Sequence, residues 1–146
     1  PNTYNIYLKS CRDGYANLVL SYYRIYQISP YFANGFCDFC EMGHYHLVKL
    51  FWDRFIRNRQ LRMDCATRAA YGGYIAIVQY LHLLGHIDFE LLFKRACVYS
   101  TNTVFIEWYI SIGGRRNRKD TMEYCKAHGA IIRFSHLVST IPGIFP

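Results

Sequence analysis

A short pattern recurs four times along the chain at nearly constant spacing. In each copy a small residue, Cys or Ala, is followed three positions later by Gly or Ser. The copies are Cys11 with Gly14, Cys40 with Gly43, Ala70 with Gly73, and Cys97 with Ser100. The small residues stand 29, 30 and 27 positions apart. Such a period is typical of repeat proteins, in which each copy forms one supersecondary unit and neighbouring units stack to bury a shared core.

Downstream of each Gly or Ser, apolar residues follow the period of a helix. The third copy shows this best, with Ile77, Val78, Leu81 and Leu84 on one face. The equivalent pairs in the other copies are Leu18-Val19, Leu47-Val48 and Val104-Phe105. We therefore expect each copy to be a helix–turn–helix. The Gly or Ser stands in the turn, the small residue lies where first helices approach, and the apolar stripes form the core.

Polar and helix-breaking residues mark where the helices begin and end. Asp88 and Ser100 are placed to cap the helices that follow them, and Asp120 with Glu123 has the spacing of a capping box. Glycine commonly follows the end of a helix, and proline interrupts one. The remaining boundaries are expected at Ser29-Pro30, Gly85 and Gly113-Gly114.

These patterns predict an all-α helical solenoid of about five helix–turn–helix repeats, forming a single domain over residues 1–146. The repeats are expected at 4–29, 30–59, 60–87, 88–115 and 116–146. The fifth, around Cys125, is degenerate, as terminal repeats that cap a stack often are. With 52% hydrophobic and 18% charged residues, the chain has the composition of a folded domain. Because it begins at Pro1, we expect a fragment or a processed form of a longer repeat protein.

Two of the copies carry a motif of the ankyrin repeat. Ala69 to Leu81 resembles the Ala-Ala-x-x-Gly-His-x-x-Ile-Val-x-x-Leu core of that family, and Cys40 to Phe51 is the second match. Gly85 to Asp88 resembles its Gly-Ala-Asp turn. The chain lacks the Thr-Pro-Leu-His opening, and its repeats are shorter than the usual length of about 33 residues. The resemblance implies an ankyrin-like solenoid whose β-hairpin fingers are reduced or absent.

The short repeats, the Cys in the Ala position and the high Tyr and Phe content resemble the multigene-family proteins of African swine fever virus, across residues 4–140. This resemblance implies a viral virulence and host-range factor in the host cytoplasm. It implies a host signalling protein as the partner, which is bound or directed to degradation so that interferon or inflammatory signalling is suppressed.

The six cysteines admit two interpretations. One is three disulfides in a secreted domain. The other is a set of free thiols, which we favour because four of them recur at the small core position of the repeat, where free Cys acts as a small hydrophobic residue: Cys11, Cys40, Cys97 and Cys125. Free thiols are typical of a reducing compartment. The sequence shows neither a signal-peptide pattern nor a run long enough to span a bilayer. We therefore expect a soluble protein of the cytoplasm with no membrane partner.

Cys37 and Cys40, followed by His44 and His46, are ligand types of a zinc site. We favour a structural interpretation, because the spacing does not match a zinc finger and Cys40 occupies the core position. No phosphate-binding loop, paired acid motif or local motif for a catalytic cysteine is found. The sequence therefore predicts no metal, no cofactor, no catalytic residues and no enzymatic activity.

The chain has a formal net charge of +7, and its basic residues gather in two clusters at inter-repeat turns. The first cluster is Arg54, Arg57, Arg59, Arg62 and Arg68, and the second is Arg115, Arg116, Arg118 and Lys119. A solvated charged loop, an acidic protein partner and nucleic acid are the three interpretations. Neither cluster contains a nucleic-acid motif. The leading hypothesis is a non-enzymatic protein–protein interaction module that uses these residues. Nucleic-acid binding is the alternative, and a homo-oligomer through an end repeat stays open.

Overall fold

The computed structural model describes residues 3–26, 30–112, 123 and 126–127 of the chain. Within these residues the regular structure is α-helical and contains no strand, which confirms the predicted all-α class. The helices are α1 (Thr3–Asp13), α2 (Ala16–Tyr26), α3 (Pro30–Glu41), α4 (Tyr45–Leu50), α5 (Trp52–Arg57), α6 (Arg59–Gly72), α7 (Ile75–Leu84), α8 (Phe89–Tyr99) and α9 (Val104–Ser111).

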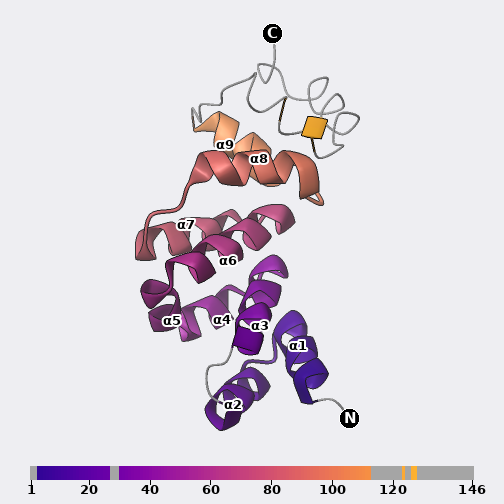
Figure 1. The fold of residues 1–146 in the computed structure, drawn as a ribbon, viewed down its shortest axis with the longest axis vertical. Helices are drawn as coiled ribbons and strands as arrows, with labels where there is room; N and C mark the ends of the chain where they lie inside the picture. Colours follow the sequence, from indigo (N-terminus) through magenta and orange to yellow (C-terminus); the bar gives the residue numbers. More distant parts are fainter. Residues whose placement is uncertain (1–2, 27–29, 113–122, 124–125, 128–146) are drawn as a thin grey trace.

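The helices are arranged as four successive pairs in the described part of the chain (Figure 1). The pairs are α1–α2, α3 with α4 and α5, α6–α7, and α8–α9, and the two members of each pair pack against each other. Each pair contains one copy of the sequence repeat. The second helix of the second pair is divided at Phe51 into α4 and α5, a break that the sequence pattern does not predict. The expected fifth repeat lies almost wholly outside the described residues, so it stays a prediction.

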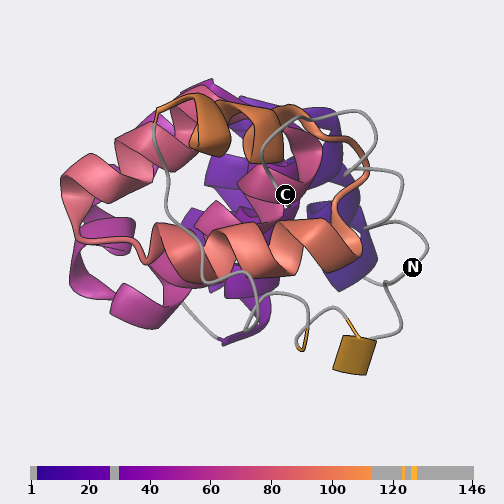
Figure 2. The ribbon, with the colours of Figure 1, turned by 90° about the horizontal axis from the view of Figure 1, so that it is seen from above.

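The first helix of each pair packs on the first helix of the next, in the order α1, α3, α6 and α8. Figure 2, which looks along the stack from above, shows the pairs lying over one another. The small residue of the repeat, Cys11, Cys40, Ala70 or Cys97, is fully buried in every copy. A small side chain at this position lets adjacent first helices approach closely, as the sequence predicts.

Most of the apolar stripes are core residues, but the two end pairs of the described stack differ from the middle ones. Leu47 and Ile77 are buried, whereas Leu18 and Val104, at the equivalent positions of the first and fourth pairs, are exposed. Each end pair has one described neighbour instead of two. The expectation that both residues of every pair are core was therefore wrong at Leu18 and Val104.

The turn inside each of the first three pairs is closed by a left-handed glycine. Gly14, Gly43 and Gly73 have φ values of 79°, 82° and 80°, which confirms the predicted role of the repeated Gly. Ser100 differs from the prediction. Its hydroxyl lies 3.0 Å from the carbonyl oxygen of Tyr71 and 2.6 Å from that of Asn102, instead of capping α9. It therefore ties the fourth turn to the third.

Boundary residues between pairs behave mostly as expected. Asp88 caps α8, since its Oδ1 accepts a hydrogen bond from the backbone N–H of Leu91 at 3.1 Å. α7 ends at Leu84, directly before Gly85. Asn58 alone connects α5 to α6, and four residues connect α7 to α8. Such connections are too short for a β-hairpin. Asp120 of the predicted capping box and the predicted stop at Gly113-Gly114 lie outside the described residues, so both stay predictions.

Gly43 offers a direct test of the turn geometry. We expect Gly43→Ala to lower the free energy of unfolding by about 2–3 kcal/mol. One cause is the φ of 82°. The other is that an added Cβ would overlap the ring of Tyr74, which follows the next turn. Urea unfolding followed by circular dichroism measures the change.

A double-mutant cycle with Tyr74→Ala separates the two causes of that loss. If Gly43→Ala is much less costly in the Tyr74→Ala background, contact between successive turns contributes to the loss. If its cost is unchanged, backbone strain alone is responsible. A cost below about 0.5 kcal/mol in either background, which is within the range of ordinary surface substitutions, would contradict the turn geometry.

Candidate protein-binding surface

The first basic cluster of the sequence falls at the junction between the second and third helix pairs. Arg54 and Arg57 lie on α5, Arg59 begins α6, and Asn58 between them is extended, with φ −122° and ψ 98°. The side chain of Asn58 caps α6 by accepting a hydrogen bond from the N–H of Leu61 at 2.9 Å. The extended conformation of Asn58 separates α5 from α6 within this cluster.

Arg62 is buried, with only 8% of its surface exposed, and the predicted surface role is wrong for this residue. Its Nη1 donates a hydrogen bond to the carbonyl oxygen of Phe55 at 2.6 Å and another to that of Ile56. These carbonyls stand at the end of α5, where no helical N–H is available to them. The guanidinium therefore acts as a C-terminal cap for α5 from inside the stack.

Arg68 is engaged by two acidic residues of the preceding pair. Its Nη2 lies 2.9 Å from Oδ1 of Asp38, and its Nε contacts Oε1 of Glu41. Burial raises the pKa of Asp38, and the neighbouring Arg68 and Arg12 guanidinium groups oppose that rise. Most of the charge of Arg68 is thus neutralised within the protein. Its main role in this structure is to link α3 to α6.

Arg57 and Arg59 are the members of the first cluster that remain exposed. Neither forms an ion pair among the described residues. Arg54 is half-buried, and its Nε is buried without a hydrogen-bond partner in the described part of the structure. The second cluster, Arg115, Arg116, Arg118 and Lys119, lies outside the described residues, so its contribution to a binding surface stays a prediction.

α5 also carries apolar side chains on its outer face. Trp52 is 48% exposed and Ile56 is 41% exposed, and they stand one turn apart on the same side of the helix. Leu83, on the neighbouring helix α7, is 82% exposed. We call Trp52, Ile56, Arg57 and Arg59 together the α5 surface. An exposed Trp and Ile beside arginines is the composition of protein-binding hot spots.

A signal for this surface is present in the sequence. The segment from Leu47 to Ile56 has apolar residues on two helical faces, whereas a helix that covers a core needs only one. Phe51 and Phe55 occupy the buried face, which leaves Trp52 and Ile56 outside. Neither residue belongs to the apolar stripe predicted for the core, and neither was predicted to bind a partner.

The Cys and His residues considered as metal ligands have other contacts. Cys37 and Cys40 are buried in the core. The Nε2 atoms of His44 and His46 lie 2.6 Å and 3.2 Å from the carbonyl oxygens of Arg12 and Gly14, in the turn of the preceding pair. No three His, Cys, Asp or Glu side chains in the described residues are arranged to hold a metal ion. The two imidazoles tie successive turns together.

The cysteines in the described part of the chain are free and buried. Burial raises the pKa of Cys11 to about 12. The pKa of Cys37 is raised by its contact with Cys65, whose sulfur is 3.6 Å away, and by burial, while burial also raises that of Cys65. These three thiols keep their protons near neutral pH, whereas a nucleophilic cysteine acts as the thiolate.

Comparison with protein-family models, curated proteins and solved structures finds no match to this chain. Within the described residues, none of the helices combines the length and the apolar character needed to cross a bilayer.

Proposed function

We propose that this chain is a non-enzymatic, ankyrin-like interaction module that binds a partner protein through the α5 surface. The observation that carries the proposal is the exposure of Trp52 and Ile56 beside Arg57 and Arg59. Burying these apolar side chains in a complex would contribute favourable free energy, because their exposed area would be removed from water.

The ankyrin-like part of the proposal is supported by the order of packing. The helix pairs are of roughly equal length, and the first helix of each pair packs on the first helix of the next. The motif segments, Cys40 to Phe51 and Ala69 to Leu81, each span a turn and the helix that follows it. The short connections at Asn58 and at Gly85 to Asp88 support reduced fingers. Without fingers, binding is assigned to helix faces and inter-repeat corners.

The partner that fits the α5 surface is a protein segment that combines an apolar anchor with acidic residues. Arg57 and Arg59 are unpaired among the described residues, and only Asp53 adds an exposed negative charge to this helix. Complementary charge would raise the association rate, and the apolar anchor would slow dissociation. Following the family resemblance, we propose a viral factor that binds a host signalling protein of the interferon or inflammatory response in the host cytoplasm.

Affinity capture from transfected cells tests the proposal with the full chain and with Arg57→Glu/Arg59→Glu. We expect specific partners to be lost from the double variant, because reversed charges would repel an acidic segment. The matched control is Lys9→Glu/Arg24→Glu, which changes the net charge equally at exposed positions on α1 and α2. Partners that bind both variants as well as they bind the wild type would contradict the α5 surface as the contact.

The second basic cluster and the nucleic-acid alternative are tested in the same system. Charge reversal at Arg115, Arg116, Arg118 and Lys119 reports whether these residues contribute, as the sequence predicts. Binding of the purified chain to DNA and RNA is titrated against salt in parallel. Affinity tighter than about 1 μM near physiological salt, with a steep salt slope, would favour nucleic acid over protein as the partner.

A further inference from the structure

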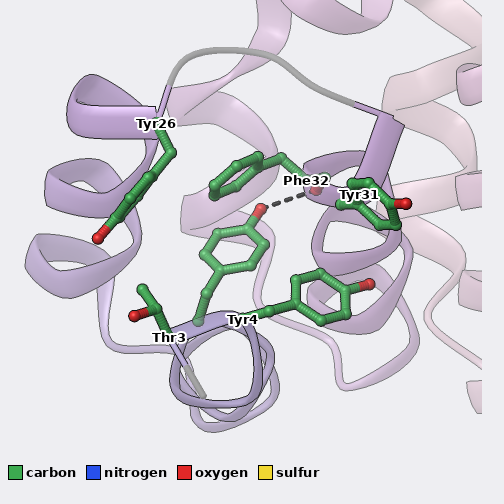
Figure 3. Close-up of a pocket in the computed structure, with 6 residues that line it drawn as sticks. Thr3, Tyr4, Tyr26, Tyr31 and Phe32 are labelled. Atoms are coloured by element: carbon green, nitrogen blue, oxygen red, sulfur yellow. Dashed lines mark hydrogen bonds between the residues drawn. The ribbon is translucent and has the colours of Figure 1, made fainter. Parts of the chain in front are cut away.

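A cavity of about 350 Å³ lies among the first three helices, away from the α5 surface. It is lined by Thr3, Tyr4 and Tyr7 of α1, Tyr26 of α2, and Tyr31 and Phe32 of α3. Figure 3 shows the ring of Tyr26 on one side of the cavity and those of Tyr4 and Tyr31 on the other. Five of the six lining side chains are therefore aromatic.

Two of the hydroxyl groups around this cavity, those of Tyr7 and Tyr4, form hydrogen bonds within the protein. The hydroxyl of Tyr7 donates a hydrogen bond to the carbonyl oxygen of Phe32 at 2.7 Å, shown as the dashed line in Figure 3. The hydroxyl of Tyr4 accepts one from the side chain of Asn34 at 2.9 Å. Ordered water needs two to four polar partners, so a cavity walled by rings is poorly suited to hold it.

The rings that line the cavity already contact one another in favourable geometries. Tyr7 and Phe32 meet edge to face with centroids 4.6 Å apart, and Tyr4 and Tyr31 do so at 5.8 Å. Tyr7 and Phe32 are buried, whereas Tyr26 and Tyr31 are exposed. The first two form the floor, and the second two flank the mouth. A group that enters can stack on rings at several angles.

Charge and size restrict what such a cavity would hold. None of the six lining residues is charged, so an ionised ligand would find no counter-ion in the wall. A dry apolar cavity of about 150 Å³ holds one benzene ring. A cavity of about 350 Å³ is therefore large enough for a group of about two rings.

We propose that this cavity is a binding site for an uncharged aromatic group of about two rings. A quaternary ammonium group, which aromatic cages also bind, fits less well. Such a cation would have no carboxylate in the wall and would enter a chain whose formal net charge is +7. The ring could arrive as a free small molecule or as a side chain of a partner protein, and both present the same chemistry to the site.

Indole is a suitable probe, because it is neutral, has two fused rings and dissolves to millimolar concentration. Saturation-transfer NMR with the full chain is expected to show saturable binding. Tyr26→Ala removes one wall of the mouth and should weaken binding at least about tenfold. Thr3→Trp should abolish it by filling the cavity from the exposed first position of α1.

Tyr15→Ala is the matched control, because Tyr15 is an exposed tyrosine that does not line the cavity. It should change the indole affinity less than twofold. Trp52→Ala should also leave indole binding unchanged, which separates this site from the α5 surface and from the proposed function. Indole binding that survives both Tyr26→Ala and Thr3→Trp, or that is lost in Trp52→Ala, would overturn the proposal, as would the absence of saturable binding.

Two competitors identify the class and the source of the ligand. Tetramethylammonium should not displace indole, and displacement at equal concentration would overturn the assignment to an uncharged group. N-acetyl-tryptophan amide presents the same ring on a short piece of backbone. Displacement by this amide at concentrations similar to those of free indole supports an aromatic side chain of a protein as the ligand. Failure of the amide, with indole still bound, supports a free small molecule.

Discussion

Trp52→Ala is expected to weaken binding of the partner protein at least about thirtyfold, or by about 2 kcal/mol or more. The indole is the largest apolar side chain of the α5 surface, and it is 48% exposed in the free chain. A partner that covers this helix would bury the exposed part against its own apolar residues. Isothermal titration calorimetry with the partner identified by affinity capture measures the loss, and the dissociation rate should carry most of it.

Two variants distinguish a lost contact from a damaged fold. Tyr15→Ala removes a similarly exposed aromatic ring elsewhere and should leave the affinity within twofold. Trp52→Phe keeps an apolar ring and should recover part of the affinity. Circular dichroism should show the same helix content for all three variants. If Trp52→Ala binds as tightly as the wild type while Arg57→Glu/Arg59→Glu does not, the contact is electrostatic and the apolar anchor is wrong.

Arg62→Ala is expected to lower the free energy of unfolding by about 3 kcal/mol, while leaving the affinity for the partner within twofold. The variant removes charged hydrogen bonds to the carbonyls of Phe55 and Ile56 and leaves a hole beneath the end of α5. Urea unfolding and partner titration on the same samples separate the two effects. A large loss of affinity without a loss of stability would restore Arg62 to the binding surface.

Gly85 provides an independent check on the position of Arg62. Its φ of −177° is open to any residue, but a Cβ there would come within 2.5 Å of the guanidinium of Arg62. Gly85→Ala should therefore destabilise the wild type by about 1–3 kcal/mol through overpacking. In the Arg62→Ala background the same change should cost little, because the space beneath it is empty. Equal costs in both backgrounds would mean that the two residues do not meet.

The regular parts of this fold could be predicted because they are encoded locally. A glycine three residues after a small residue predicts a left-handed turn, and Gly14, Gly43 and Gly73 form one. The stripe of Ile77, Val78 and Leu81 predicts a helix with one buried face. The capping role of Asp88 depends on its own side chain and the next three residues. In each case the deciding atoms lie within a few positions of one another.

The candidate site could be predicted only in part. A basic cluster at an inter-repeat corner was expected, and Arg57 and Arg59 are exposed there. Arg62 and Arg68 belong to the same run of sequence. However, Arg62 is buried and caps α5, and Arg68 links α6 to α3. Their directions are set by the bend at Asn58 and by the acidic residues of α3, about 30 positions earlier. The apolar half of the α5 surface, Trp52 and Ile56, was not predicted as part of the site.

By itself, the sequence determined the helical class, the repeat length, the turns and the small buried positions, because these depend on backbone preference and on periodicity within one repeat. Only the tertiary structure decided which side chains face outward. That choice depends on which surfaces the neighbouring pair covers, and a helix with two apolar faces, such as α5, can bury only the one that meets its neighbour. The same stacking turned Arg62 inward, exposed Trp52, and enclosed a cavity among five aromatic rings.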